Sequence, residues 1–346
     1  MTPLPLNPLF KIAPGPVSLL LFVRVALAVG LPLVGFTLAG QPVAAVAGGA
    51  TAMFVTLCDV GSTRSGRTKM MLLGLLAILV GGVAGDKFGG STGIDEVLVI
   101  ASAFVAAWVS NSQPGLATVA RFGAVATAAG VGLQITNPQA VSAIVAGGLG
   151  AIGVGLLIAW LAALPADKDD MDWRAGLRRA LDGADAGPRF AICAALTAAV
   201  ALFAAQSLGV NRPYWATLTV ILVMRREGMV SLKLTIHYLA GTLLGIPLAA
   251  LLWQLAGSQV SIALLATVAA ASSRLGMALN PALGFACMTM FMVLVSDLAR
   301  HDPAGPAPLV AARLYDVALG GALAIVGTLL AGAWHRNAQR PTRTLN

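Results

Sequence analysis

The chain has 346 residues, of which 58% are hydrophobic and only 10% are charged, and its mean hydropathy is +0.86. Soluble domains carry about 25% charged residues, so the composition excludes an ordinary soluble protein and predicts an integral membrane protein. The formal net charge of +8 does not require nucleic acid, because basic loops of membrane proteins face the cytoplasm; no nucleic-acid partner is expected.

Apolar runs separated by charged residues or by Pro, Gly and Asn predict an all-α, polytopic membrane protein. β-Barrel alternation is absent, so helices must satisfy the backbone in lipid. Four of the runs are short, and each of them is either a full span or half of a re-entrant hairpin: 42–58, 97–110, 213–224 and 259–272. The predicted segments number about twelve: 17–38, 42–58, 70–85, 97–110, 115–135, 140–163, 189–207, 213–224, 235–253, 259–272, 278–296 and 308–334.

The basic residues predict the orientation. If all segments cross, most arginines and lysines fall in loops on one side, whereas Lys87, Arg212 and Arg300 fall on the other. The side rich in basic residues is cytoplasmic, so both termini are expected in the cytoplasm.

One long polar stretch divides the chain in two. Residues 164–188 combine Met171, Trp173 and Leu177 at helical spacing with arginines between them, which is typical of an amphipathic helix on the inner leaflet and predicts membrane lipids as partners. The predicted organisation is a membrane repeat at 1–163, this cytoplasmic linker at 164–188, and a second membrane repeat at 189–346.

The two halves resemble each other weakly but in the same order. RVALAV from Arg24 matches RFAICAAL from Arg189, and SNSQPGLA from Ser110 matches MALNPALG from Met277. Near the end of each half, the pair Gly147 and Gly148 matches the pair Gly320 and Gly321. Six spans per half is an even number, so both copies should enter the membrane from the same side as parallel repeats.

Two of the short segments, 42–58 and 213–224, begin at a proline and occupy matching positions in the repeats. Part-length helices between repeats are typical of transporter binding sites, and a helix start attracts anions. The candidate substrate-binding residues at the second helix start are Asn211, Arg212, Tyr214 and Trp215. Alternatively, the two aromatic residues are interfacial anchors.

Ionisable residues at membrane depth indicate function. Arg313 and Asp316 lie three residues apart and are predicted to meet a substrate carboxylate and to exchange a proton, respectively; the alternative is a structural ion pair. His237 is a second candidate for proton coupling, or else a packing residue. Arg24 and Arg189 occupy matching places and are expected to snorkel to lipid headgroups.

Other motifs point to packing rather than chemistry. The glycine motifs GGVAG at 81–85 and GTLLG at 241–245 predict close helix contacts and are compatible with a homodimer. Cys58, Cys193 and Cys287 are scattered without metal-ligand spacing, and no nucleotide-binding or hydrolase motif occurs in a usable context. No metal, no cofactor and no enzyme activity are therefore expected.

Three stretches together resemble the fusaric acid resistance protein-like (FUSC) and aromatic acid exporter proteins: PYWATLTVILV with its following basic turn, HYLAGTLLGIPLA, and ARLYDVALGGALAIVGTLL. The similarity is good across 189–334 and weaker across 20–163. It places Tyr214, Trp215, Gly241, Thr242, Gly245, Arg313 and Asp316 on motif positions of the family.

The resemblance implies a multi-pass protein of the cell inner membrane that exports small organic anions, above all aromatic carboxylic acids, by proton-coupled antiport. Two alternatives stay open. One is a passive organic-anion channel, because plant malate channels are distant relatives of the family. The other is a membrane scaffold that transports nothing and binds partners through its glycine ridges.

Overall fold

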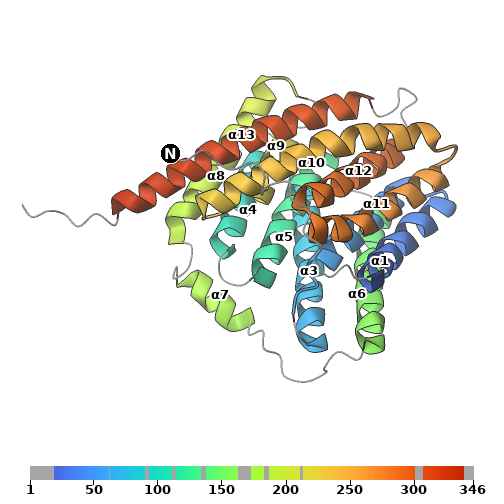
Figure 1. Cartoon of the computed structure of the whole chain (residues 1–346). Coiled ribbons are helices and arrows are strands. Elements are labelled where there is room, and N and C mark those ends of the chain that lie inside the picture. The colour runs from blue at the N-terminus through green and yellow to red at the C-terminus, as the bar shows by residue number, and fades with distance from the viewer. Residues whose placement is uncertain are drawn as a thin grey trace, which may run out of the picture.

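The computed structural model describes residues 19–61, 63–89, 93–110, 114–133, 138–162, 173–182, 187–210, 213–300 and 307–338. In these ranges the chain forms α-helices and no strands (Figure 1). The helices are α1 Leu19–Leu38, α2 Pro42–Leu57, α3 Arg64–Phe88, α4 Ile94–Val109, α5 Pro114–Leu133, α6 Pro138–Leu161, α7 Trp173–Leu181, α8 Gly187–Ser207, α9 Tyr214–Val223, α10 Gly228–Leu255, α11 Gln259–Leu279, α12 Pro281–Arg300 and α13 Ala307–Ala338.

The predicted all-α membrane fold is confirmed, and every predicted apolar segment contains a helix. Nine helices in the described ranges are long and apolar enough to cross a membrane. Helices α2 and α9 are apolar but shorter, and α4 has only 16 residues. The expectation of a short segment at 259–272 was wrong, because α11 continues to Leu279. The Ser273 hydroxyl donates a hydrogen bond to the carbonyl oxygen of Ala270 in the same helix, and Arg274 lies near the charges of Arg24 and Arg67, so neither residue stops the helix.

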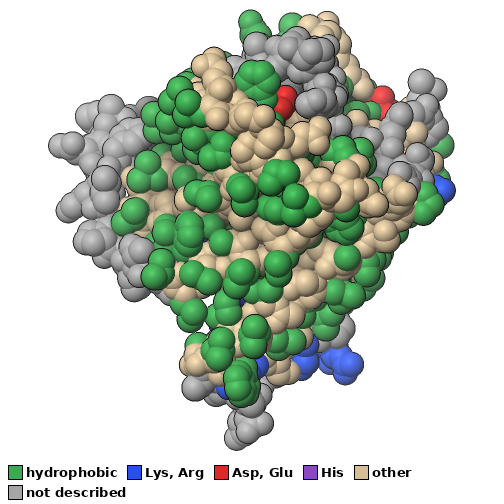
Figure 2. All heavy atoms as spheres, turned by 90° about the vertical axis from the view of Figure 1, so that its right-hand side faces the viewer, with side chains coloured by type: hydrophobic (Ala, Val, Ile, Leu, Met, Phe, Trp, Pro, Cys, Tyr) green, Lys and Arg blue, Asp and Glu red, His purple; other side chains and the backbone are tan. Residues whose placement is uncertain are grey.

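The surface fits a lipid environment. Large hydrophobic side chains such as Leu31, Leu76, Leu243 and Leu329 are exposed, whereas a soluble protein rarely shows wide apolar surface. In Figure 2, hydrophobic side chains spread over the whole face that is turned to the viewer, and most of the basic side chains gather at its lower end. The chain is therefore a multi-pass membrane protein.

Helix α7 forms inside the predicted linker. Its residues Leu177 and Leu181 are exposed beside the basic pair Arg178 and Arg179, as expected for an amphipathic helix. It lies next to α4 and α5 (Figure 1). The rest of the predicted linker, apart from a turn residue and the first residues of α8, lies outside the described residues.

The same helix pairings recur in the two halves. In the first half α3 packs on α5, α2 on α6, and α1 on α2; in the second half α10 packs on α12, α9 on α13, and α8 on α9. Between the halves, α1 contacts α11, and the corresponding helix α8 contacts α4. This reciprocal exchange is what a two-fold relation between copies produces, and it supports the predicted internal repeat.

Glycines allow these matching helix pairs to approach closely. A Cβ on Gly85 of α3 would overlap the carbonyl oxygen of Thr127 in α5, and a Cβ on Gly245 of α10 would overlap that of Ala286 in α12. Similarly, Gly147 of α6 meets the backbone of α2, and Gly320 of α13 meets the backbone of α9. The glycine motifs thus pack helices within each half.

Candidate functional site

The short helix α9 is built around its proline start. Pro213 is the residue before the first helical position, and no side chain caps the helix there. Ten helical residues span about 15 Å, half of a bilayer core of about 30 Å. Six residues of α9 are buried, among them Thr217 and Thr219. Most of the helix is therefore buried in the protein, and its first residues face interior groups.

Tyr214 and Trp215 are consecutive, so their side chains point about 100° apart around the helix axis. The Tyr214 hydroxyl donates a hydrogen bond of 2.7 Å to a carboxylate oxygen of Asp95 in α4. Trp215 instead faces α13, where the guanidinium carbon of Arg313 lies 5.0 Å from its ring centroid. These two predicted substrate-binding residues therefore belong to different contacts.

Arg313 is the centre of the second contact. It is 7% exposed, stacks over Trp215, and donates a hydrogen bond of 2.7 Å to the hydroxyl of Tyr238 in α10. Tyr238 is itself held edge-on against Phe285 of α12. The Nε atom of Arg313 is buried and has no hydrogen-bond partner, which leaves one donor of a buried cation available.

The two candidates for proton coupling lie on neighbouring helices. Asp316 follows Arg313 by one turn of α13 and is 0% exposed. His237 precedes Tyr238 in α10 and is buried, with its ring Nδ1 2.7 Å from the carbonyl oxygen of Lys233. A buried carboxyl one turn from a buried guanidinium is chemically suited to take up a proton when an anion occupies the arginine.

The structure thus brings Trp215 and Arg313 together, with Asp316 one turn away. The side chain of Tyr214 instead contacts Asp95 of α4. Asn211 and Arg212 lie outside the described residues. Tyr238 was missed by sequence reasoning, although it sits beside His237 in a quoted motif. Its signal was weak, because a single tyrosine in an apolar helix looks like packing.

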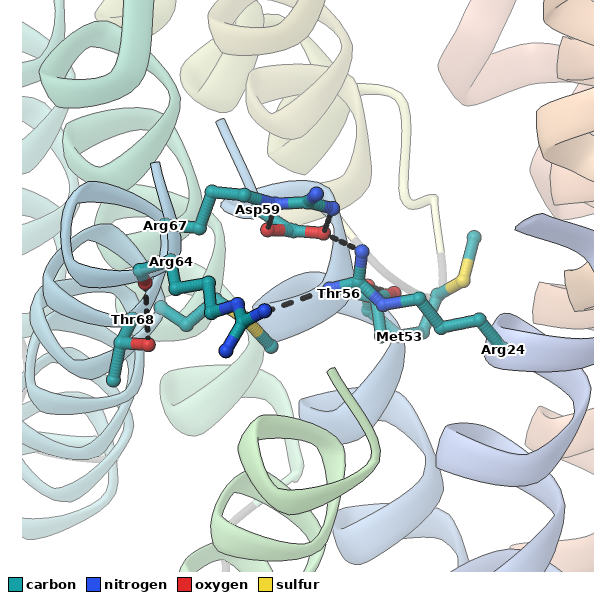
Figure 3. A network of polar contacts seen from close by, with 8 residues as sticks. Arg24, Met53, Thr56, Asp59, Arg64, Arg67 and Thr68 are labelled. Atoms are coloured by element: carbon teal, nitrogen blue, oxygen red, sulfur yellow. Dashed lines mark hydrogen bonds and ion pairs between the residues drawn. The ribbon is translucent and has the colours of Figure 1, made fainter. Parts of the chain in front are cut away.

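A second polar cluster, also missed, lies at the end of the first half's short helix (Figure 3). Asp59 follows α2 and forms ion pairs with Arg24 of α1 and Arg67 of α3. The Arg67 Nε donates to the other Asp59 oxygen at 2.6 Å. Arg24 is only 3% exposed, so the prediction that it snorkels to lipid was wrong: Asp59 offers it a buried partner. Arg189 is exposed, as snorkelling requires.

This cluster holds more positive than negative charge. The guanidinium of Arg274 in α11 acts electrostatically on both Arg24 and Cys58. The Nε atoms of Arg24, Arg64 and Arg274 are buried without hydrogen-bond partners. Cys58, at the end of α2, is fully buried beside this cluster and forms no disulfide.

Contacts between the halves join ends that the sequence assigned to the same membrane face. Arg274 lies with Arg24 and Arg67, all on the predicted cytoplasmic side. Tyr214 meets Asp95 where α9 and α4 both begin, on the predicted outer side. Copies inserted the same way up make these contacts, whereas an inverted repeat would separate them. The contacts therefore support parallel repeats.

In the described part of the chain, no group of three His, Cys, Asp or Glu side chains could hold a metal ion, and the three cysteines are free.

The fold and these buried charges define a polytopic helical membrane protein with a buried polar cluster in each half. Residues 199–327, from within α8 to within α13, match the family model described as fusaric acid resistance protein-like. The predicted resemblance is confirmed for this segment, and with the apolar helices it indicates a membrane protein of the transport or efflux type. No curated protein and no solved structure matches the chain.

Proposed function

We propose that this protein exports small organic anions, above all aromatic carboxylic acids, across the cell inner membrane by proton-coupled antiport, with both termini in the cytoplasm. The observation that carries the proposal is the buried guanidinium of Arg313, which Trp215 and Tyr238 hold at the start of a short helix. Asp316 lies one turn away and is fully buried.

Each contact has a role in this proposal. The free Nε donor of Arg313 binds the substrate carboxylate through a charge-assisted hydrogen bond. Trp215 offers its ring to the aromatic part of the substrate, and the positive end of α9 adds to the attraction. Tyr238 fixes the guanidinium in place.

Asp316 couples transport to protons. When a carboxylate leaves Arg313, the buried Asp316 side chain is the nearest anionic group on the same helix, so it is favoured in its charged form. When the substrate binds, two negative charges compete for one arginine, and Asp316 is favoured in its neutral form. Substrate binding and proton binding at this site therefore depend on each other.

Transport into inside-out vesicles tests this proposal. Vesicles with the purified protein and an imposed pH gradient should accumulate labelled benzoate, and a protonophore should abolish the accumulation. Arg313→Gln should lower uptake at least tenfold, while Asp316→Asn should leave exchange of benzoate for benzoate and remove its dependence on the gradient. Arg189→Gln, at an exposed arginine, is the matched control. Gradient-independent uptake by the unmodified protein would overturn the antiport.

A further inference from the structure

On the predicted cytoplasmic side, each short helix ends in a region that we call an inner corner. The first corner is the cluster of Asp59, Arg24 and Arg67 after α2. The second corner, around Met224 and Arg225 after α9, corresponds to it but has different chemistry. Helices α2 and α9 end at Cys58 and Met224, their respective C-cap residues. The next residue is Asp59 in the first half and Arg225 in the second. The position that supplies the carboxylate in one corner thus supplies a guanidinium in the other.

A small pocket opens at this second corner, between α4, α5, α8 and α9. Its lining is mostly apolar and includes Ala107, Phe190 and Met224, with Ser110 and Arg121 as polar members. In the repeat, SNSQPGLA from Ser110 matches MALNPALG from Met277. This alignment makes Ala107 the counterpart of Arg274. The long side chain that lies in the first corner is replaced here by a methyl group, and this truncation leaves space.

The charges around this pocket are of one sign. Arg225 follows the lining residue Met224 and donates a hydrogen bond of 2.8 Å to its carbonyl oxygen. Burial and then repulsion from Arg121 lower the pKa of Arg225 to about 9. The ion pairs recorded among the described residues are both made by Asp59, so neither Arg121 nor Arg225 has a carboxylate partner there.

We infer that the pocket lined by Arg121 and Met224, with Arg225 next to Met224, binds the carboxylate group of a small organic anion on the cytoplasmic side. The first corner shows what this arrangement accepts, because there the chain's own Asp59 carboxylate lies between guanidiniums (Figure 3). In the second corner the carboxylate has to come from a ligand. The apolar lining around Ala107 and Phe190 suits the hydrocarbon part of such an acid.

The identity of the ligand rests on the proposed function, whereas the existence of an anion site does not. An exporter must collect its substrate from the cytoplasm, and this pocket lies among residues of the predicted cytoplasmic face. Helix α7 packs near α4 and α5, two of the helices that form the pocket, and brings its exposed arginines to the same region. These charges would raise the local concentration of anions.

Benzoate binding to the purified full-length chain in nanodiscs tests the inference. The measurements use an Arg313→Gln background, which removes the other proposed carboxylate site, and calorimetry or equilibrium dialysis as the readout. Added to that background, Arg121→Gln should weaken benzoate binding at least tenfold. Arg225→Asp, which copies the first corner, should abolish it. The matched control is Arg226→Gln, at the exposed neighbouring arginine, which should leave the affinity unchanged.

A variant that leaves both arginines in place guards against misfolding. Ala107→Leu should fill the pocket and weaken the binding of both benzoate and benzyl alcohol, which has the same ring without the charge. Benzyl alcohol should bind the background protein and its two arginine variants equally. Benzoate affinity that is the same in the background protein and in its Arg121→Gln and Arg225→Asp derivatives would overturn the inference. Arginine-dependent binding by a protein that moves no benzoate across a membrane would uphold it and overturn the proposed transport.

Discussion

The two inner corners share one helix arrangement and differ in how their charge is balanced. In the first, the Asp59 carboxylate forms ion pairs with both Arg24 and Arg67. In the second, Arg121 lines a pocket and Arg225 follows its lining residue Met224, and neither arginine has a recorded ion pair among the described residues. We infer from the comparison that two repeats can keep the same helix packing while one is held together by a buried ion pair and the other binds an anion.

The largest effect is expected when the buried ion pairs of Asp59 are removed. Asp59→Asn leaves Arg24 buried without a counter-ion, and removing one partner of a buried ion pair costs about 3–5 kcal/mol. Thermal unfolding in detergent should show a large loss of stability. Glu227→Gln is the control, since that carboxylate lies in the equivalent loop and is exposed. Equal melting temperatures for both variants would show that the ion pairs of Asp59 do not stabilise the protein.

The second largest effect tests whether the halves pack alike. Gly85→Ala and Gly245→Ala each push a methyl group into a backbone carbonyl of the facing helix, and such overpacking costs about 1–3 kcal/mol. Both variants should lose similar stability in the same unfolding assay. Gly150→Ala, where the added carbon meets nothing, should not. Loss in only one half would contradict equivalent packing.

A smaller effect separates the two tyrosines near the start of α9. Tyr238→Phe removes a hydrogen bond to charged Arg313, and such bonds contribute about 1.5–3 kcal/mol; the KM for benzoate transport should rise about tenfold with little change in kcat. Tyr214→Phe, which loses only its bond to Asp95, should lower stability and leave KM unchanged. The reverse pattern would move the substrate site to Asp95.

The smallest effect is expected for Arg189, one of the two arginines that the repeat aligns. Arg189 is exposed, so Arg189→Gln should change stability by about 0.5 kcal/mol or less. Arg24→Gln removes a buried partner of Asp59 and should destabilise far more. Unfolding curves of the two variants side by side measure the difference. Similar losses would mean that the ion pair between Arg24 and Asp59 adds no stability beyond that of a surface arginine.

Much of the fold could be predicted because lipid imposes long apolar runs with sharp polar ends. The boundaries of α2 and α9 follow from Pro42 and Pro213, whose rings fit the first turn of a helix. Gly147 and Gly320 were aligned by sequence alone, and both contact the backbone of the short helix of their own half. The predicted segment at 259–272 was too short because polar residues inside a span resemble the end of a span.

The site was harder to predict because it depends on which helices meet. Arg313 could be singled out as a charge at membrane depth, but its partners Trp215 and Tyr238 come from two other helices. Arg24 and Arg189 look alike in sequence, and only the position of Asp59 makes one of them buried. The pocket at Ala107 carries no sequence signal, since an alanine in a span is ordinary.

The most direct test of the shared orientation of the halves is cysteine labelling in a protein whose three native cysteines are replaced. Gln41→Cys and Val210→Cys lie just before the short helices, while Val60→Cys and Arg226→Cys lie just after them. With an impermeant maleimide on intact spheroplasts, parallel repeats predict labelling at 41 and 210 and protection at 60 and 226. Labelling at 41 and 226 with protection at 60 and 210 would mean that the copies are inverted, and the two corners could not share the cytoplasmic face.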